Sequence, residues 1–182
     1  MTFVVIEQPG KLHENQRKAR FVCGESVFYL RVLIAGALLG LTVPLMAGRD
    51  LALVSNKTNT VTDMAVPELV KVCKAQIDRW PDGKPVTFIM RAPSAPEMRV
   101  FLEKVLQLTE AQVKELITTA NHGRPNHPAI LVVPSDEELV DKVASTPGAV
   151  GVVDVYAINS SVTVIKLAGK LPLEPGYLLH GN

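Results

Sequence analysis

The chain has 182 residues, of which 47% are hydrophobic and 20% are charged, as expected for a folded globular protein rather than a disordered one. The first 48 residues hold five Lys/Arg and three Asp/Glu, which leaves fourteen Lys/Arg and fifteen Asp/Glu from Arg49 onward. A region with that balance has no broad basic face to neutralise a phosphate backbone, which argues against nucleic-acid binding.

The N-terminal part has the order of an export signal. Residues 1–26 are a polar, basic extension, and residues 27–48 are expected to be a signal peptide or a membrane anchor. The uncharged apolar run at 32–47 is short of the roughly 20 residues that a membrane-spanning helix needs, which favours the signal peptide. Residues 27–30 could extend a tilted span, so the anchor stays open. Either reading places the rest of the chain in the periplasm or otherwise outside the cytoplasm, because the basic flank stays inside.

Residues 49–182 are expected to form a single α/β domain. Apolar runs predict strands at 50–57, 85–91, 129–134, 147–155 and 161–167. Amphipathic segments predict helices at 66–77, 95–108, 109–120 and 135–146. Strands that alternate with helices predict a central sheet with helices on both faces.

Two turns have clear local chemistry. In "WPDG", Pro81 presets φ and Gly83 accepts a positive φ, while Trp80 is expected to cover the edge of the core, with ligand stacking as the lesser alternative. After the helix at 135–146, Gly148 is expected to supply a left-handed turn into the next strand. Capping spacings at Thr109–Gln112 and at Ser135–Glu138 mark two helix starts.

The polar residue types that carry catalysis do not form a recognisable constellation. Cys73 is expected to be a buried small hydrophobe, and the loop histidines His122 and His127 have no third ligand near them in sequence, so neither a metal nor a cofactor is expected. No phosphate loop or nucleophile elbow occurs, and we expect a protein that is not an enzyme. Asn56 and Asn159 each begin a glycosylation sequon, a pattern that is common by chance.

Several segments together resemble a known family. "DLALVSNKTNTVTDMAVPELVKV", "IDRWPDGKPVTFIMRAPSAPEMRVFLEKVL" and "SDEELVDKVASTPGAVGVVDV" are similar to the phosphate-binding periplasmic proteins of ABC importers, within the type II solute-binding superfamily. "ASTPGAVGVV" beside "RWPDGKPV" is the most specific part, and the resemblance spans nearly all of residues 50–182. It implies a Rossmann-like lobe with a central mixed sheet, and an extracytoplasmic location.

The resemblance also implies a binding site. In the family, an arginine at a strand end and a Ser-Gly-Thr turn at the next helix N-terminus hold the phosphate; Arg91 matches the arginine and Ser94 the serine. Ala95 and Pro96 replace the Gly-Thr pair. The expected ligand-binding residues are therefore Arg91, Ser94 and Ala95. Larger members add a second lobe with the other half of the site, and little but the leader precedes Asp50 here.

A competing interpretation of the same corner stays open. Ser94 and Glu97 have the spacing of a capping box, which would use the helix N–H groups and place a carboxylate where a phosphate would sit. We therefore expect an extracytoplasmic solute-binding-type protein with weak oxyanion binding at most, working with an ABC transporter membrane component. The alternative is a protein-interaction module of the cell envelope on the same scaffold, with another envelope protein as partner.

Overall fold

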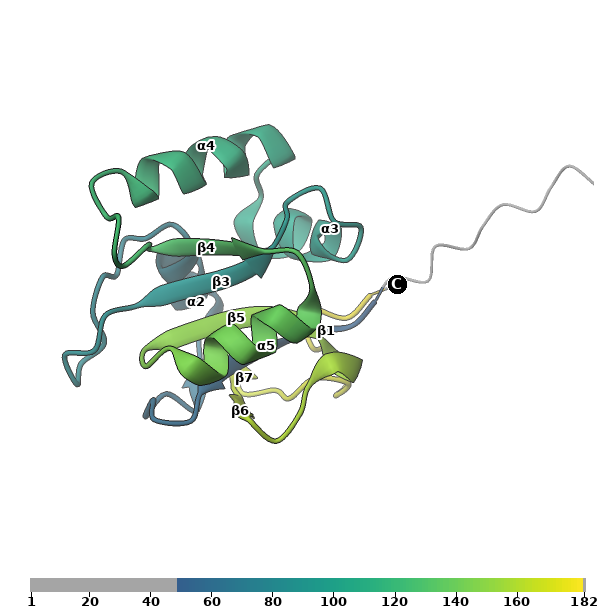
Figure 1. The fold of residues 1–182 in the computed structure, drawn as a ribbon. Coiled ribbons are helices and arrows are strands. Elements are labelled where there is room, and N and C mark those ends of the chain that lie inside the picture. Colours follow the sequence, from purple (N-terminus) through teal and green to yellow (C-terminus); the bar gives the residue numbers. More distant parts are fainter. Residues whose placement is uncertain (1–48, 182) are drawn as a thin grey trace, which may run out of the picture. The chain divides into compact units, whose positions relative to one another are not determined.

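A computed structural model describes residues 49–181; the expectations for residues 1–26 and 27–48 lie outside the described part. The centre of the fold is a five-stranded sheet with the strand order β4-β3-β5-β1-β6 (Figure 1). Its strands are β1 (Leu51–Asn56), β3 (Thr87–Arg91), β4 (Ile130–Val133), β5 (Ala149–Asp154) and β6 (Val162–Val164).

The sheet is mixed, as the family resemblance implied. β3 runs parallel to β4 and to β5, whereas β1 is antiparallel to both β5 and β6. Every residue of β1 and of β5 is buried, because both strands are central and covered on both faces. Their near-continuous apolar sequences reflect that double burial.

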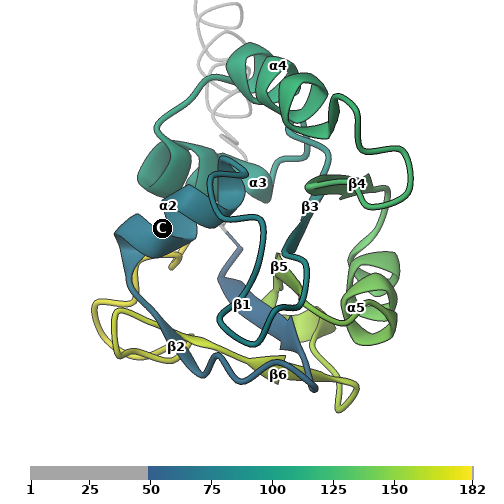
Figure 2. The same ribbon diagram turned by 90° about the vertical axis from the view of Figure 1, so that its left-hand side faces the viewer.

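Helices cover both faces of the sheet. In Figure 2, α5 (Asp136–Ser145) lies on one side, and α2 (Val66–Cys73) and α3 (Met98–Phe101) lie on the other. A π-helical segment, η1 (Leu102–Leu106), continues α3 directly, and α4 (Glu110–Asn121) lies along the β4 edge. The arrangement confirms an α/β fold with a central mixed sheet and helices on both faces.

Alternate residues of the strands feed two separate cores. Leu53 and Phe88 pack with Cys73 on the side of α2 and α3, and Val54 and Ile89 pack on the side of α5. Cys73 is buried as predicted, and burial raises the pKa of its thiol well above the ordinary value.

Three predicted elements differ from the structure. The helix at 66–77 already ends at Cys73, since Ala75 has a left-handed backbone with φ of 54°. The helix at 95–108 begins only at Met98 and passes into η1. The strand at 161–167 is interrupted at Ile165: the residues before it pair with β1, and from Lys166 onward the chain pairs with the segment at 62–64.

That break produces a second, small sheet. Residues after Ile165 form β7 (Lys166–Leu167), which pairs in parallel with β2 (Asp63–Met64). A 3₁₀ turn, η2 (Val155–Ala157), follows β5. Neither β2 nor its pairing was predicted, because a two-residue strand has no detectable periodicity.

The two segments that carry the most specific resemblance meet in space. Trp80 is 5% exposed, and its Nε1–H donates to Gly148 O at 2.8 Å. Gly148 has φ of +86° and Gly83 has φ of +83°, as both turns predict. Trp80 therefore covers the core edge and is not free to stack on a ligand.

Two predicted helix caps are present. Thr109 and Gln112 form a full capping box at the start of α4, and Ser135 Oγ accepts the N–H of Glu138 at the start of α5. Within residues 49–181, no helix combines the length and the apolar character that a membrane crossing requires.

Candidate oxyanion-binding corner

The sheet topology places Arg91 at a strand–helix corner. β3 and β4 are parallel, with Arg91 opposite Val133, so both strands end at the same edge, on the right of Figure 1. The chain that leaves β4 turns at once into α5, whose first residue is Asp136. Residues 45 positions apart in the sequence are thereby brought side by side.

The Arg91 guanidinium is held by two carboxylates. Its Nη1 lies 2.9 Å from Glu97 Oε1 and 3.0 Å from Asp136 Oδ2. The side chains of Glu97 and Asp136 are only 9% and 10% exposed, and that of Arg91 is 19% exposed. One positive charge thus faces two negative charges in a largely desolvated place.

This cluster is not fully satisfied internally. Arg91 Nε and Asp136 Oδ1 are buried and have no hydrogen-bond partner among the described residues. Burial raises the pKa of the Asp136 carboxyl above its ordinary value, and the attraction of Arg91 only partly opposes that rise. Glu97 and Asp154 add further negative charge nearby, which raises the pKa in the same direction.

The backbone donors of the corner are partly used. Ala95 N–H donates to Ala92 O at 2.8 Å within the turn that leads to α3, and Pro96 has no N–H. Ser94 is exposed and Ala95 is half-buried. An incoming anion therefore finds fewer free N–H groups here than an ordinary helix N-terminus offers.

The capping box expected between Ser94 and Glu97 is wrong. Glu97 itself occupies the N-cap position of α3, and no side chain accepts a hydrogen bond from the first N–H groups of that helix. The Glu97 carboxylate points to Arg91 instead, because a charged partner stabilises it more than a single amide would.

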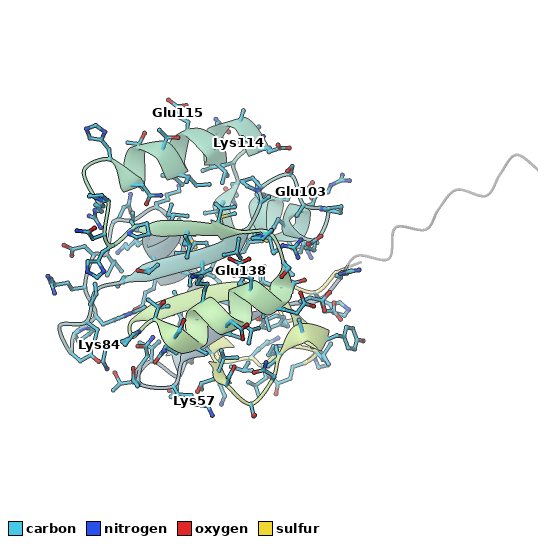
Figure 3. The ribbon with its side chains drawn as sticks, viewed as in Figure 1. Lys57, Lys84, Glu103, Lys114, Glu115 and Glu138 are labelled. Atoms are coloured by element: carbon cyan, nitrogen blue, oxygen red, sulfur yellow. The ribbon has the colours of Figure 1, made fainter. Side chains whose placement is uncertain are left out.

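Two of the three expected ligand residues line a hollow of about 580 Å³ between the 93–96 turn, the α3–η1 segment and the start of α4. Ser94 and Ala95 contribute to its wall, together with Glu103, which Figure 3 labels beside α3. Arg91 is not among its lining residues. The structure thus brings Ser94 and Ala95 to one surface hollow and directs Arg91 toward the carboxylates.

Asp136 is the residue of this corner that sequence reasoning missed. The acids of "SDEEL" were interpreted as the favourable first turn of a helix, which they are. The signal that could have found Asp136 is the strand–helix–strand order from 85 to 134, which favours parallel pairing of β3 and β4 and so brings the residues after both strands together.

His122 and His127 lie in the loop between α4 and β4, and the described residues contain no group of three or more His, Cys, Asp or Glu side chains placed to bind a metal ion.

Solved structures similar to this fold include phosphate-binding proteins. An ABC-type phosphate transport receptor from Vibrio cholerae is 21% identical with a TM-score of 0.58, over 72% of this chain and 53% of that one. PstS from Borrelia burgdorferi is 16% identical with a TM-score of 0.56, over 74% of this chain and 55% of that one.

A third structure was solved with a bound ligand. It is a phosphate ABC transporter substrate-binding protein with bound phosphate from Clostridium perfringens, described as putative, at 18% identity and a TM-score of 0.52. The match covers 66% of this chain and 46% of that one. The chain thus spans about half the length of the structures it matches, and the likeness at this identity concerns the fold.

No curated protein matches the chain at a significant level. The model of the PBP superfamily domain, in contrast, matches residues 40–175. That match covers most of the chain and agrees with the resemblance of its segments, so the protein belongs to the PBP superfamily.

Proposed function

We propose that the protein is an extracytoplasmic solute-binding-type protein, related to the binding proteins of phosphate ABC importers, that binds phosphate or another oxyanion weakly if at all. The observation that carries this proposal is the pair of carboxylates on Arg91, at 2.9 and 3.0 Å. The family scaffold and an arginine at its strand end support the solute-binding class. The two carboxylates on Arg91 support a low affinity for oxyanions.

A low affinity for anions follows from the negative charge beside Arg91 and from the small number of free N–H donors. An anion at Arg91 must displace at least one carboxylate or bind a cluster whose formal charge is already negative. Each charge-assisted hydrogen bond that is lost costs about 1.5–3 kcal/mol, and about 1.4 kcal/mol is tenfold in affinity. The loss of two such bonds, about 3–6 kcal/mol, is enough to turn micromolar binding into millimolar binding.

Calorimetric titration of the full-length protein with phosphate and sulfate tests the proposal. We expect a binding site at the corner with a dissociation constant in the millimolar range, and Arg91→Ala should remove that site. Glu97→Gln removes a negative charge beside Arg91 and keeps the side-chain length, so it should tighten binding about tenfold. Lys114→Gln, a substitution on α4 away from the corner, is the control (Figure 3).

A flat titration for both the natural protein and Glu97→Gln would contradict oxyanion binding at Arg91. An unchanged affinity in Arg91→Ala would place any binding elsewhere. Either result would leave the scaffold assignment intact.

The second candidate function is a protein-interaction module of the cell envelope on the same scaffold, without a small-molecule ligand. The two ion pairs of Arg91 favour it, because the charge of the guanidinium is already neutralised by carboxylates of the protein. The expected partner is an ABC transporter membrane component or another envelope protein. Mild crosslinking in intact cells should then trap one discrete partner, and Arg91→Ala should leave the yield unchanged.

A further inference from the structure

A second hollow lies at the opposite end of the sheet from Arg91. It forms between the turn at 78–86, before β3, and the loop at 122–128, before β4, both on the left-hand side of Figure 1. Its volume is about 450 Å³. Arg79, Arg124 and His127 contribute to its wall, with Asn126 and a single acidic residue, Asp78.

The charges of this hollow differ from those of the corner. Residues 49–181 contain five arginines, and three of them form ion pairs: Arg49, Arg91 and Arg99. The other two, Arg79 and Arg124, have no carboxylate within 4.0 Å in the described part of the chain, and both line this one hollow. Two guanidinium groups against one carboxylate give it a positive formal charge.

The backbone that carries both arginines is held in place. Arg79 Nη1 donates to Gly83 O at 2.8 Å, and Val86 N–H donates to Asp78 O at 2.9 Å, which closes the turn. On the other side, Arg124 N–H donates to Asn121 O at 3.0 Å.

Asn121 in turn is fixed to the β4 edge. Its amide donates to Ile130 O at 2.7 Å and accepts from Ile130 N–H at 3.0 Å. Because both loops are anchored before any ligand arrives, binding orders little additional backbone.

We propose that this hollow is a binding site for a small oxyanion, one that carries phosphate or carboxylate groups. The planar fork of a guanidinium matches the oxygens of both groups. Arg124 offers its whole guanidinium, and Arg79 offers the N–H donors that its bond to Gly83 O leaves free. Asn126 and His127 supply further N–H donors. The volume falls within the range of small-ligand pockets. The site is separate from the corner at Arg91 and does not depend on it.

The test uses the full-length protein with Arg91→Ala, so that the corner contributes nothing. Inorganic phosphate, sulfate and citrate are titrated calorimetrically into this protein and into one that also carries Arg79→Gln and Arg124→Gln. We expect saturable binding of at least one anion, and at least a tenfold loss of affinity in the Arg79→Gln/Arg124→Gln variant. Citrate against phosphate distinguishes a carboxylate ligand from a phosphate ligand.

A variant with both Lys57→Gln and Lys166→Gln controls for the effect of net charge on anion affinity, because it removes two positive charges from exposed positions outside the hollow. Lys57 is labelled in Figure 3. This control should change affinity less than twofold. Arg124→Gln alone separates an effect on binding from an effect on folding, since the Arg124 side chain makes no hydrogen bond or ion pair within the described residues. It should keep the thermal midpoint and still weaken binding several-fold.

Absence of saturable binding for all three anions would overturn the proposal, as would an equal loss in the lysine control. Binding of an oligo-aspartate peptide without binding of any of the three anions would overturn it too, in favour of an acidic protein partner. Binding by the natural protein that Arg91→Ala abolishes completely would support the proposed corner and reject this site.

Discussion

Asn56 connects the end of β1 to the end of α5 through both halves of its amide. Its Nδ2 donates to Val143 O at 2.8 Å and to Ala144 O at 2.7 Å, carbonyls in the last turn of α5 that have few other partners. Its Oδ1 accepts from Thr58 N–H at 2.9 Å. Asn56 is 4% exposed, so the side chain that begins this sequon has a structural role.

Asn56→Asp should destabilise the fold by about 3 kcal/mol near neutral pH, because a buried carboxylate would replace the donor that two carbonyls need. The introduced carboxyl would have a raised pKa, so the loss should shrink as pH falls and the group gains a proton. Urea unfolding between pH 7 and pH 4 measures both effects.

Asn159→Asp is the matched control. Asn159 also begins a sequon, but it is exposed and uses only Oδ1, which accepts from Ser161 N–H at 2.8 Å. An aspartate accepts the same bond, so the change should stay within about 0.5 kcal/mol. Equal effects of the two substitutions would show that the Nδ2 bonds of Asn56 contribute nothing.

Arg91 and its partners show which parts of the corner could be predicted from the sequence. The sequence placed Arg91 correctly at a strand end, because "PVTFIM" has a clear strand pattern. It did not identify Asp136 as a partner of Arg91, since that contact depends on which strand lies beside β3 in the sheet. Whether Arg91, Ser94 and Ala95 bind a ligand stays a prediction.

At the scale of elements, the turns that precede two neighbouring strands, β3 and β5, are packed against each other. The turn before β5 packs directly on the turn before β3: a Cβ added to Gly148 would lie 2.0 Å from Pro85 O. Asn59 Oδ1 accepts Gly148 N–H at 2.9 Å, and Trp80 donates to Gly148 O. Glycine is needed at 148 for its conformation and for its lack of volume.

Gly148→Ala should therefore cost about 3 kcal/mol or more, because the left-handed backbone and a clash with a main-chain oxygen add together. Gly83→Ala separates the two causes. Gly83 has a similar φ of +83°, but a Cβ added there would meet no heavy atom within 4 Å, so only the backbone cost of about 1–2 kcal/mol applies.

Thermal or urea unfolding of both variants checks this difference. If Gly83→Ala lowered the free energy of unfolding as much as Gly148→Ala, the close approach of Gly148 to Pro85 would make no contribution to stability.

Elements with a long, regular pattern were predicted well, and short or interrupted ones were not. α4 and α5 begin within one residue of the predicted starts, because their caps are local chemistry. The π-helical η1 and the break at Ile165 have no local signal. Ile165 N–H still donates to Leu53 O in register with the β1–β6 pairing, and the chain changes partner only at Lys166, whose N–H donates to Thr62 O more than a hundred residues away in sequence.

For the molecule as a whole, β1 is the strand that completes the sheet. It lies between β5 and β6, and Leu51, Ala52, Leu53 and Val54 are fully buried. Just before it, Asp50 O accepts from Val155 N–H at 3.0 Å and Asp50 Oδ1 accepts from Gly181 N–H at 2.8 Å. These contacts tie both ends of the described chain to one core.

A chain that starts at Arg49 should therefore fold on its own, with a thermal midpoint within a few degrees of the full-length protein. A chain that starts at Lys57 lacks β1 and should show no cooperative unfolding. Each buried leucine that is lost costs about 2–5 kcal/mol, and the loss of the whole strand exceeds the roughly 5–15 kcal/mol that stabilises a typical domain.

Circular dichroism melts of the two truncated chains and of the full-length protein provide the measurement. Failure of the chain from Arg49 to fold would mean that the domain extends into residues 1–48, against the boundary predicted from the sequence. Cooperative melting of the chain from Lys57 would mean that β5 and β6 hold the sheet without β1. Because the two chains differ only by eight residues, seven of them buried or half-buried, the comparison isolates the contribution of the central strand.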